Sequence, residues 1–157
     1  MTRWLDDNQQ RAWRAYLQAS NSLWDVLDRQ LQQDSGINHA YYEILVTLSE
    51  APDRQLRMSE LAERLLSSRS RLSHAVARLE ERGWVERVAC PTDRRGQLAV
   101  LTDAGFQALV GAAPGHVAAV RANLVDVLTP AQLRALRDIS EAISAATAKN
   151  PPPPARC

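Results

Sequence analysis

Two adjacent arginines carry the clearest chemistry in this sequence. Arg94 and Arg95 lie within residues 90–97, a segment whose proline, aspartate and glycine favour a turn. Short apolar stretches at residues 85–88 and 98–101 flank it and predict the two strands of a β-hairpin. A hairpin that holds two guanidinium groups away from the protein can place them in the narrow, electronegative minor groove of DNA. A solvated surface loop is the alternative interpretation, and this segment alone does not decide between them.

Two helices joined by a tight turn are predicted directly before the hairpin. The first begins with Ser59 as its N-cap, and Glu60 in its first turn faces the positive end of the helix dipole. Its apolar residues share one face and are Leu61, Ala62 and Leu65. The second helix is predicted over residues 69–83, with Ser67 or Ser68 as its N-cap.

The second helix has one apolar face and one polar face. Its apolar residues, spaced by four and three, are Leu72, Val76 and Leu79. Gly83 is placed as the left-handed residue that ends the helix, and Trp84 then packs on Leu79. The outer side suits the major groove of DNA, where Arg71 can bind guanine through two hydrogen bonds. The candidate DNA-binding residues here are Ser68, Arg69, Ser70, Arg71, Ser73, His74 and Arg78.

The order and spacing of these pieces resemble the multiple-antibiotic-resistance regulator (MarR) family of winged helix-turn-helix regulators. The resemblance extends from about Trp4 to Ala148. A lone Asp-x-Arg would be weak evidence, but here it follows Leu-Glu-x-x-Gly and precedes Leu-Thr-x-x-Gly at the family's distances. The matching segments are Leu61-Ala62, residues 70–87, Asp93-Arg94-Arg95-Gly96 and Leu101-Thr102-Asp103-Ala104-Gly105. The chain has Ser73-His74 where the family usually has Thr and then Arg or another polar residue, a difference that concerns the operator sequence.

The resemblance implies a mainly α fold with a small β-wing, in which residues 37–114 form a winged helix-turn-helix DNA-binding region. Residues 1–36 and 115–149 would form a helical dimerisation region, so that a homodimer binds double-stranded DNA at a palindromic operator. By this resemblance Arg95 enters the minor groove, Arg94 contacts a phosphate and Asp93 orients the loop. The implied function is a transcriptional regulator, usually a repressor.

The remaining segments are predicted to be helical. A long amphipathic helix covers residues 6–34, and Asn38 caps the next helix, which is followed by a short strand at residues 56–58. After the hairpin, Thr102 caps a helix that reaches about residue 127 and is interrupted or bent near residues 111–115. A capping box at Thr129-Pro130-Ala131-Gln132 opens a last helix. The proline-rich residues 150–157 are predicted to be a disordered tail.

Aromatic and apolar residues on the outer helices suggest two further partners. The first helix exposes tryptophans, and the last carries an apolar stripe of Leu133, Leu136, Ile139 and Ile143, so a second copy of the chain is expected to cover them. Family members also bind phenolic or other aromatic anions between the dimerisation helices and the DNA-binding region. The candidate effector-binding residues are Trp13, Tyr16, His39, Tyr42 and His116. Aromatic residues at helical spacing also serve as ordinary core.

Composition limits the other functional classes. The net charge is only +1, but residues 57–96 contain nine arginines and six acidic residues, so this segment carries +3 and the remainder −2. No nucleophile elbow, phosphate loop or metal-spaced cluster predicts an enzyme, a cofactor or a metal site. No apolar run near 18 residues and no signal peptide is evident, which favours a cytoplasmic protein without a membrane partner.

Two alternatives to a ligand-responsive regulator stay open. A winged-helix dimer can serve as a nucleoid-associated or protein-interaction module that lacks operator specificity. The chain also has two cysteines, Cys90 in the hairpin and Cys157 at the last position, which suggest neither a disulfide framework nor a zinc site. Oxidation of Cys90 would distort a DNA-contacting element, so a thiol-based redox sensor is the second alternative.

Overall fold

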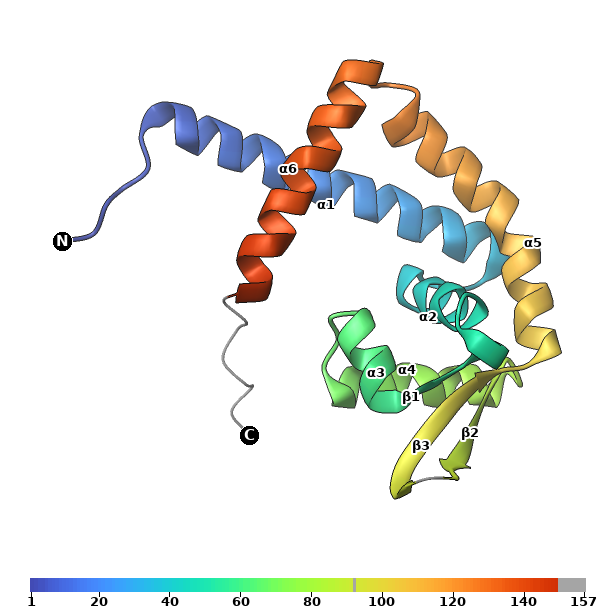
Figure 1. Cartoon of the computed structure of the whole chain (residues 1–157). Coiled ribbons are helices and arrows are strands. Elements are labelled where there is room, and N and C mark those ends of the chain that lie inside the picture. Colours follow the sequence, from blue (N-terminus) through green and yellow to red (C-terminus); the bar gives the residue numbers. More distant parts are fainter. Residues whose placement is uncertain (92, 150–157) are drawn as a thin grey trace. The chain divides into compact units, whose positions relative to one another are not determined.

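A capping box opens the first helix of the chain. Asp6 accepts a hydrogen bond from the backbone N–H of Gln9 at 2.8 Å, and the Gln9 side chain accepts one from the N–H of Asp6 at 3.1 Å. A computed structural model describes residues 1–91 and 93–149, and its elements follow the predicted order (Figure 1). The elements are α1 Asp7–Ser35, α2 His39–Ser49, a 3-10 turn Pro52–Arg54, β1 Gln55–Arg57, α3 Met58–Arg64, α4 Arg69–Glu81, β2 Val85–Cys90, β3 Asp93–Leu101, α5 Asp103–Val120, a π turn Arg121–Val125 and α6 Pro130–Lys149.

The chain divides into two units. The first, Met1–Ala119, contains α1 to α4, the sheet and nearly all of α5, and the second begins at Val120 and contains α6. Two helix-start predictions are confirmed: Asn38 accepts from the N–H of Tyr41 at 2.9 Å, and Thr129 and Gln132 form the expected capping box. The mainly α fold with a small sheet is therefore as predicted.

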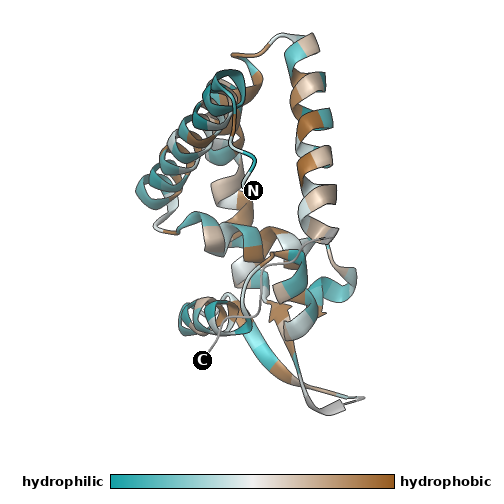
Figure 2. Ribbon diagram, turned by 90° about the vertical axis from the view of Figure 1, so that its left-hand side faces the viewer, coloured by the Kyte–Doolittle hydropathy of each residue, from teal (hydrophilic) through white to brown (hydrophobic). Residues whose placement is uncertain are grey.

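The sheet has three antiparallel strands in the order β1-β3-β2. Leu56 of β1 pairs with Ala99 of β3, and Val85 of β2 pairs with Leu101 of β3. In both views β2 and β3 continue beyond the helices as a two-stranded ribbon (Figures 1 and 2). The ribbon is longer than predicted, because β2 extends to Cys90 and β3 starts at Asp93.

One hydrophobic core holds the first unit together. Residues from α1 to α5 and all three strands meet in it, and its fully buried side chains include Leu31, Leu45, Leu61, Val76 and Leu79. Because each element contributes only its apolar face, the opposite faces stay in solvent. The core thus fixes α4 against α2, α3 and the root of the ribbon.

Two local predictions are wrong. Ser59 is not the N-cap of α3, because Arg57 still has strand geometry, Met58 is already helical and Ser59 falls inside the first turn. The interruption offered for residues 111–115 is also absent, since α5 runs through Pro114, which removes only one helical hydrogen bond, while the alternative of a bend there stays a prediction. The irregularity is the π turn, where the N–H of Asp126 donates to the carbonyl of Arg121 at 2.8 Å.

One helical stretch, residues 103–125, is long and apolar enough to cross a membrane by length and composition alone. Core helices pass the same test, so a single stretch is weak evidence. In the first unit Leu109, Ala112 and His116 of α5 are buried against protein. The predicted tail, residues 150–157, lies outside the residues that the structure describes.

Candidate nucleic-acid interface

A tight turn between α3 and α4 sets the direction of α4. Leu66 adopts a left-handed φ of 49°, and the N–H of Ser67 donates to the carbonyl of Ala62 at 2.9 Å. Ser68 is the N-cap of α4, because its hydroxyl accepts from the N–H of Arg71 at 3.2 Å. Of the two serines offered by the sequence, the structure therefore selects Ser68.

Helix α4 is anchored by its apolar face and presents its polar face to solvent. Leu72, Val76 and Leu79 are at most 2% exposed. Seven residues at the N-cap of α4 and along it were predicted to bind DNA, and six of them are exposed: Ser68, Arg69, Ser70, Arg71, His74 and Arg78. The seventh, Ser73, is half-buried at the edge of this face. The structure thus brings together on one surface the side chains that the sequence assigned to the major groove.

The C-terminal end of α4 has the predicted glycine cap. Gly83 has a φ of 70°, and its N–H donates to the carbonyl of Glu80 at 2.8 Å. The N–H of Trp84 donates to the carbonyl of Leu79 at 3.0 Å, which completes a Schellman motif. Trp84 packs against the core cluster that contains Leu79. The chain therefore leaves α4 in a fixed direction and enters β2.

The start of α5 is joined to this cap. The hydroxyl of Thr102 accepts from the N–H of Gly105 at 3.0 Å and donates to the carbonyl of Gly83 at 2.7 Å. The N–H of Thr102 donates to the carbonyl of Trp84 at 3.0 Å. A Cβ on Gly105 would lie only 2.1 Å from the Trp84 carbonyl oxygen, so no larger residue fits without movement. The Leu-Thr-x-x-Gly signature is thus a joint between α4 and α5, a role that the sequence analysis did not find.

The wing has an irregular register near its tip. Pairing is regular from Val85 opposite Leu101 to Ala89 opposite Gln97, but the next pair is Cys90 opposite Asp93. Residues 94–96 are therefore out of register with β2, as in a bulge. Arg94 and Arg95 belong to this segment of β3, and the side chains of Asp93, Arg94 and Arg95 lie outside the described part of the structure.

A groove of about 380 Å³ lies between α4 and the wing. Arg69 and Ser73 of α4 line one side, and Gly96 and Gln97 of β3 line another. Arg57 of β1 and Met58 and Ser59 of α3 also line it. Polar side chains from the helix and the ribbon therefore face a shared open space.

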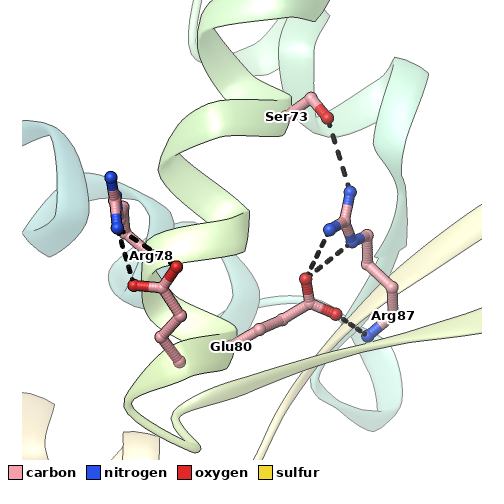
Figure 3. A network of polar contacts seen from close by, with 5 residues as sticks. Ser73, Arg78, Glu80 and Arg87 are labelled. Carbon is pink, nitrogen blue, oxygen red and sulfur yellow. Dashed lines mark hydrogen bonds and ion pairs between the residues drawn. The ribbon is translucent and has the colours of Figure 1, made fainter.

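Arginine and glutamate pair in two ways around α4 (Figure 3). Arg78 binds both carboxylate oxygens of Glu81, at 2.9 and 3.1 Å, within the exposed surface of the helix. Arg87 of β2 instead reaches across to Glu80 and Ser73 of α4. A phosphate that binds Arg78 must compete with Glu81, whereas Arg87 is engaged in holding strand and helix together.

Three of the five predicted effector residues come together. The ring of His116 lies 4.4 Å from that of Tyr42 and 5.7 Å from that of His39, centroid to centroid, and Trp24 of α1 contacts His39 at 4.6 Å. Trp24 was not among the effector-binding candidates from the sequence. The other two candidates, Trp13 and Tyr16, stack on each other along α1 at 6.1 Å and are about half exposed.

Burial shifts the acid–base properties of this cluster. His116 is 8% exposed, and its Nδ1 lies 3.3 Å from Oε1 of Gln30. Burial, and then the nearby His39, lower the pKa of His116 below its ordinary value, while burial raises the pKa of Tyr42. Both residues thus favour their neutral forms, which suits an apolar junction.

The remaining candidates for chemistry are Cys90 and a metal site. Cys90 is buried at the end of β2, with 7% exposure. Within residues 1–91 and 93–149, no group of three or more His, Cys, Asp or Glu side chains could hold a metal ion.

Comparison with known proteins identifies the family. Residues 35–96 match the model of the MarR family. Sco3205 is a MarR family transcriptional regulator from Streptomyces coelicolor, and its crystal structure was solved in complex with DNA. Its sequence is 50% identical to this chain, and the two structures match with a TM-score of 0.91 over 99% of this chain and 96% of that one. The chain belongs to the MarR family. AbsC, a family member from the same organism, is 41% identical over 95% of this chain and 100% of that one, with a TM-score of 0.90.

Curated relatives match this chain over a shorter part of its length. The transcriptional repressor MprA of Escherichia coli is 36% identical over 74 residues, which is 47% of this chain and 42% of MprA. The match thus spans less than half the length of that relative. All of these relatives are transcriptional regulators rather than enzymes, and the family is the one that the sequence signature indicated.

Proposed function

We propose that this MarR-family protein is a sequence-specific DNA-binding transcriptional regulator that acts as a repressor. The observation that carries the proposal is the outer face of α4, where six exposed Ser, Arg and His side chains stand on a helix whose other face is fully buried. Such a helix fits the major groove, while the wing that carries Arg94 and Arg95 lies on the same unit and reaches for the minor groove.

The relatives support this function. Sco3205, which is similar over almost the whole chain, was solved in complex with DNA, and MprA is named a transcriptional repressor. A regulator of this kind acts where the chromosome is, which in a bacterium is the cytoplasm. We propose that this chain likewise binds DNA, represses transcription and acts in the cytoplasm.

A homodimer completes the proposal. On α1, Trp13 and Trp24 are each 51% exposed, and on α6, Ile139 and Ile143 are 56% and 42% exposed. Large apolar side chains exposed along whole helices favour a partner surface. A two-fold dimer then presents two copies of α4 to half-sites about 10 base pairs apart, which predicts a palindromic operator.

Release by a small aromatic or phenolic ligand is the proposed regulation. The cluster of Trp24, His39, Tyr42 and His116 joins α1, α2 and α5 in the first unit. The rings pack directly on one another, so a flat aromatic anion has to separate them and thereby move the helices that carry α4. A shift of a few ångströms per recognition helix costs operator affinity, because both must fit successive grooves at once.

The test is binding of purified protein to the intergenic DNA beside its own gene, located by footprinting, against random DNA of the same length. We expect the operator to bind at least about 10³-fold more tightly than random DNA. Arg95→Ala should weaken operator binding by about 1–3 kcal/mol and make the salt dependence shallower. Equal affinity for both DNAs would overturn operator recognition in favour of a nucleoid-associated role, and an Arg95→Ala protein with unchanged affinity and salt slope would remove the wing from the interface.

A further inference from the structure

Arg87 connects the root of the wing to the recognition helix. Its Nη2 lies 2.6 Å from Oε2 of Glu80, its Nε donates to the same oxygen at 2.8 Å, and its backbone N–H donates to the other carboxylate oxygen at 3.1 Å (Figure 3). The side chains are 26% and 29% exposed, so the pair is partly shielded from water. Two of these contacts come from the guanidinium group and the third from the backbone, and together they hold Arg87 against one carboxylate.

The remaining edge of this guanidinium group faces Ser73. Nη1 of Arg87 donates to the Ser73 hydroxyl oxygen at 3.4 Å, a long hydrogen bond. Ser73 and Glu80 are seven residues apart, so they lie on the same side of α4 two turns from each other, a separation of about 10 Å. Arg87 thus bridges two turns of the helix from the neighbouring strand.

This contact uses one of the hydrogen-bonding positions of the Ser73 hydroxyl. A serine hydroxyl has one donor hydrogen and two acceptor positions. Within the described part of the chain, the bond from Arg87 is the one hydrogen bond made by this hydroxyl, and it occupies an acceptor position. The hydrogen and the second acceptor position stay available to other partners, and Ser73 lines the open groove between α4 and Gly96 and Gln97 of the wing.

We propose that Arg87 is a positioning residue for DNA recognition, which Glu80 holds in place and which orients the Ser73 hydroxyl as a donor. The group that it meets is a hydrogen-bond acceptor on a base edge in the major groove, such as guanine O6 or N7 or thymine O4. The inference rests on the proposed function, because it assigns a specificity role within the same interface.

Arginine is required for this role by its shape. Its planar group offers several N–H donors at fixed angles, so it binds a carboxylate with one edge and a hydroxyl with another, whereas lysine presents a single point charge. The Arg78–Glu81 pair shows the contrast, since both partners belong to α4, are more than 60% exposed and reach no strand. Substitution of Arg87 by lysine therefore keeps the charge near the DNA and removes the geometry.

The experiment compares Arg87→Lys, Ser73→Ala and the double variant with the wild type. The measurement is the ratio of random-DNA to operator dissociation constants at one salt concentration. We expect each single variant to lower this ratio by about fivefold to tenfold, the loss of one oriented hydrogen bond. The double variant should lose no more than either single one, because both remove the same contact. Affinity for random DNA should stay unchanged.

The matched control is Arg64→Lys. Arg64 pairs with Glu60 at 2.7 Å within α3, so the same substitution disrupts an arginine–glutamate pair that does not touch α4. It should leave the ratio at the wild-type value. The thermal midpoint of each variant shows whether it folds as stably as the wild type. The ¹H–¹⁵N resonance of Arg87 Nε, recorded in the free protein, shows whether the guanidinium group keeps its position. Ser73→Ala should shift that resonance without unfolding the protein.

The outcomes separate the inference from the proposed function. Wild-type protein without operator preference overturns both. If Arg87→Lys and Ser73→Ala leave the operator preference unchanged, the positioning role alone is overturned. The same conclusion follows if Arg64→Lys lowers the ratio of dissociation constants as much as Arg87→Lys does. Additive losses in the double variant also overturn it, because they would mean that Arg87 and Ser73 act independently.

Discussion

Alanine in place of Gly105 tests whether the joint between α4 and α5 sets the stability of the DNA-binding unit. Glycine inside an exposed helix normally costs about 1 kcal/mol relative to alanine, so this substitution is usually stabilising. At Gly105 the sign should reverse. A Cβ there would lie 2.1 Å from the carbonyl oxygen of Trp84 and 2.8 Å from Cδ1 of Leu101, whereas Cβ contacts below 3.0 Å essentially never occur.

The size of the effect follows from the movement required. The two backbones must separate by the 0.9 Å between 2.1 and 3.0 Å. Such a shift stretches the bonds from Thr102 to the carbonyls of Trp84 and Gly83, now 3.0 and 2.7 Å, beyond their normal range. Two hydrogen bonds at about 1 kcal/mol each and an overpacking cost of about 1–3 kcal/mol outweigh the helix propensity gain of about 1 kcal/mol, for a net loss of about 2–4 kcal/mol.

Gly111 provides the matched control, since it lies in the same helix with nothing within 4 Å of a Cβ. We expect Gly111→Ala to stabilise the protein by about 0.5–1 kcal/mol. For a chain of this size the thermal midpoint should fall by about 4–16 °C in Gly105→Ala and rise by about 1–4 °C in Gly111→Ala. Both midpoints are measured at one protein concentration, because dimerisation would add to stability. Equal and positive shifts in the two variants would refute the close approach at Gly105.

Three further predictions concern other parts of the chain. Leu66→Asn should stabilise the protein by about 0.5–1 kcal/mol in urea unfolding, because Leu66 is 95% exposed with a left-handed φ that asparagine tolerates; a loss of stability would contradict this strain. The lowered pKa of His116 means that the unfolded chain binds the proton more readily, so stability should fall as pH drops below about 6.5. In His116→Gln, stability should depend less on pH in this range. If the pH profile of the variant is unchanged, the loss of stability at low pH comes from other groups. Ile139→Asp on α6 should raise the dimer dissociation constant in sedimentation experiments by at least about tenfold, and an unchanged constant would place the dimer contact elsewhere.

Local signals in the sequence were sufficient for most of the fold. Each confirmed helix end depends on residues within one turn of it, as with Ser68 before α4, Gly83 after it and Thr102 before α5. The outer face of α4 also followed from helical periodicity, because the buried residues Leu72, Val76 and Leu79 repeat at three and four. Such features need no knowledge of distant contacts.

The errors arose where distant segments decide the local conformation. Ser59 is a good N-cap by type, but the pairing of Arg57 with Leu98 in the sheet fixes where the strand ends and the helix begins. The extent of the wing was underestimated because its tip is held by strand pairing rather than by turn residues. The cluster of His39, Tyr42 and His116 joins residues that are far apart in sequence, so its members could be suspected as aromatic residues but their packing could not be derived.

The joint around Gly83 explains why the signature extends beyond the residues proposed to face DNA. A winged-helix protein must place a helix and a hairpin in two grooves at once, and any freedom between them has to be removed on binding at a cost in entropy. Glu80 holds Arg87 of the wing, Gly83 directs the chain out of α4, and Thr102 and Gly105 close the next helix onto the same point. Helix and wing are therefore already fixed to each other in the free protein. Substitutions at Thr102 or Gly105 should weaken binding to every DNA sequence alike, whereas substitutions on the outer face of α4 should change which sequence is preferred.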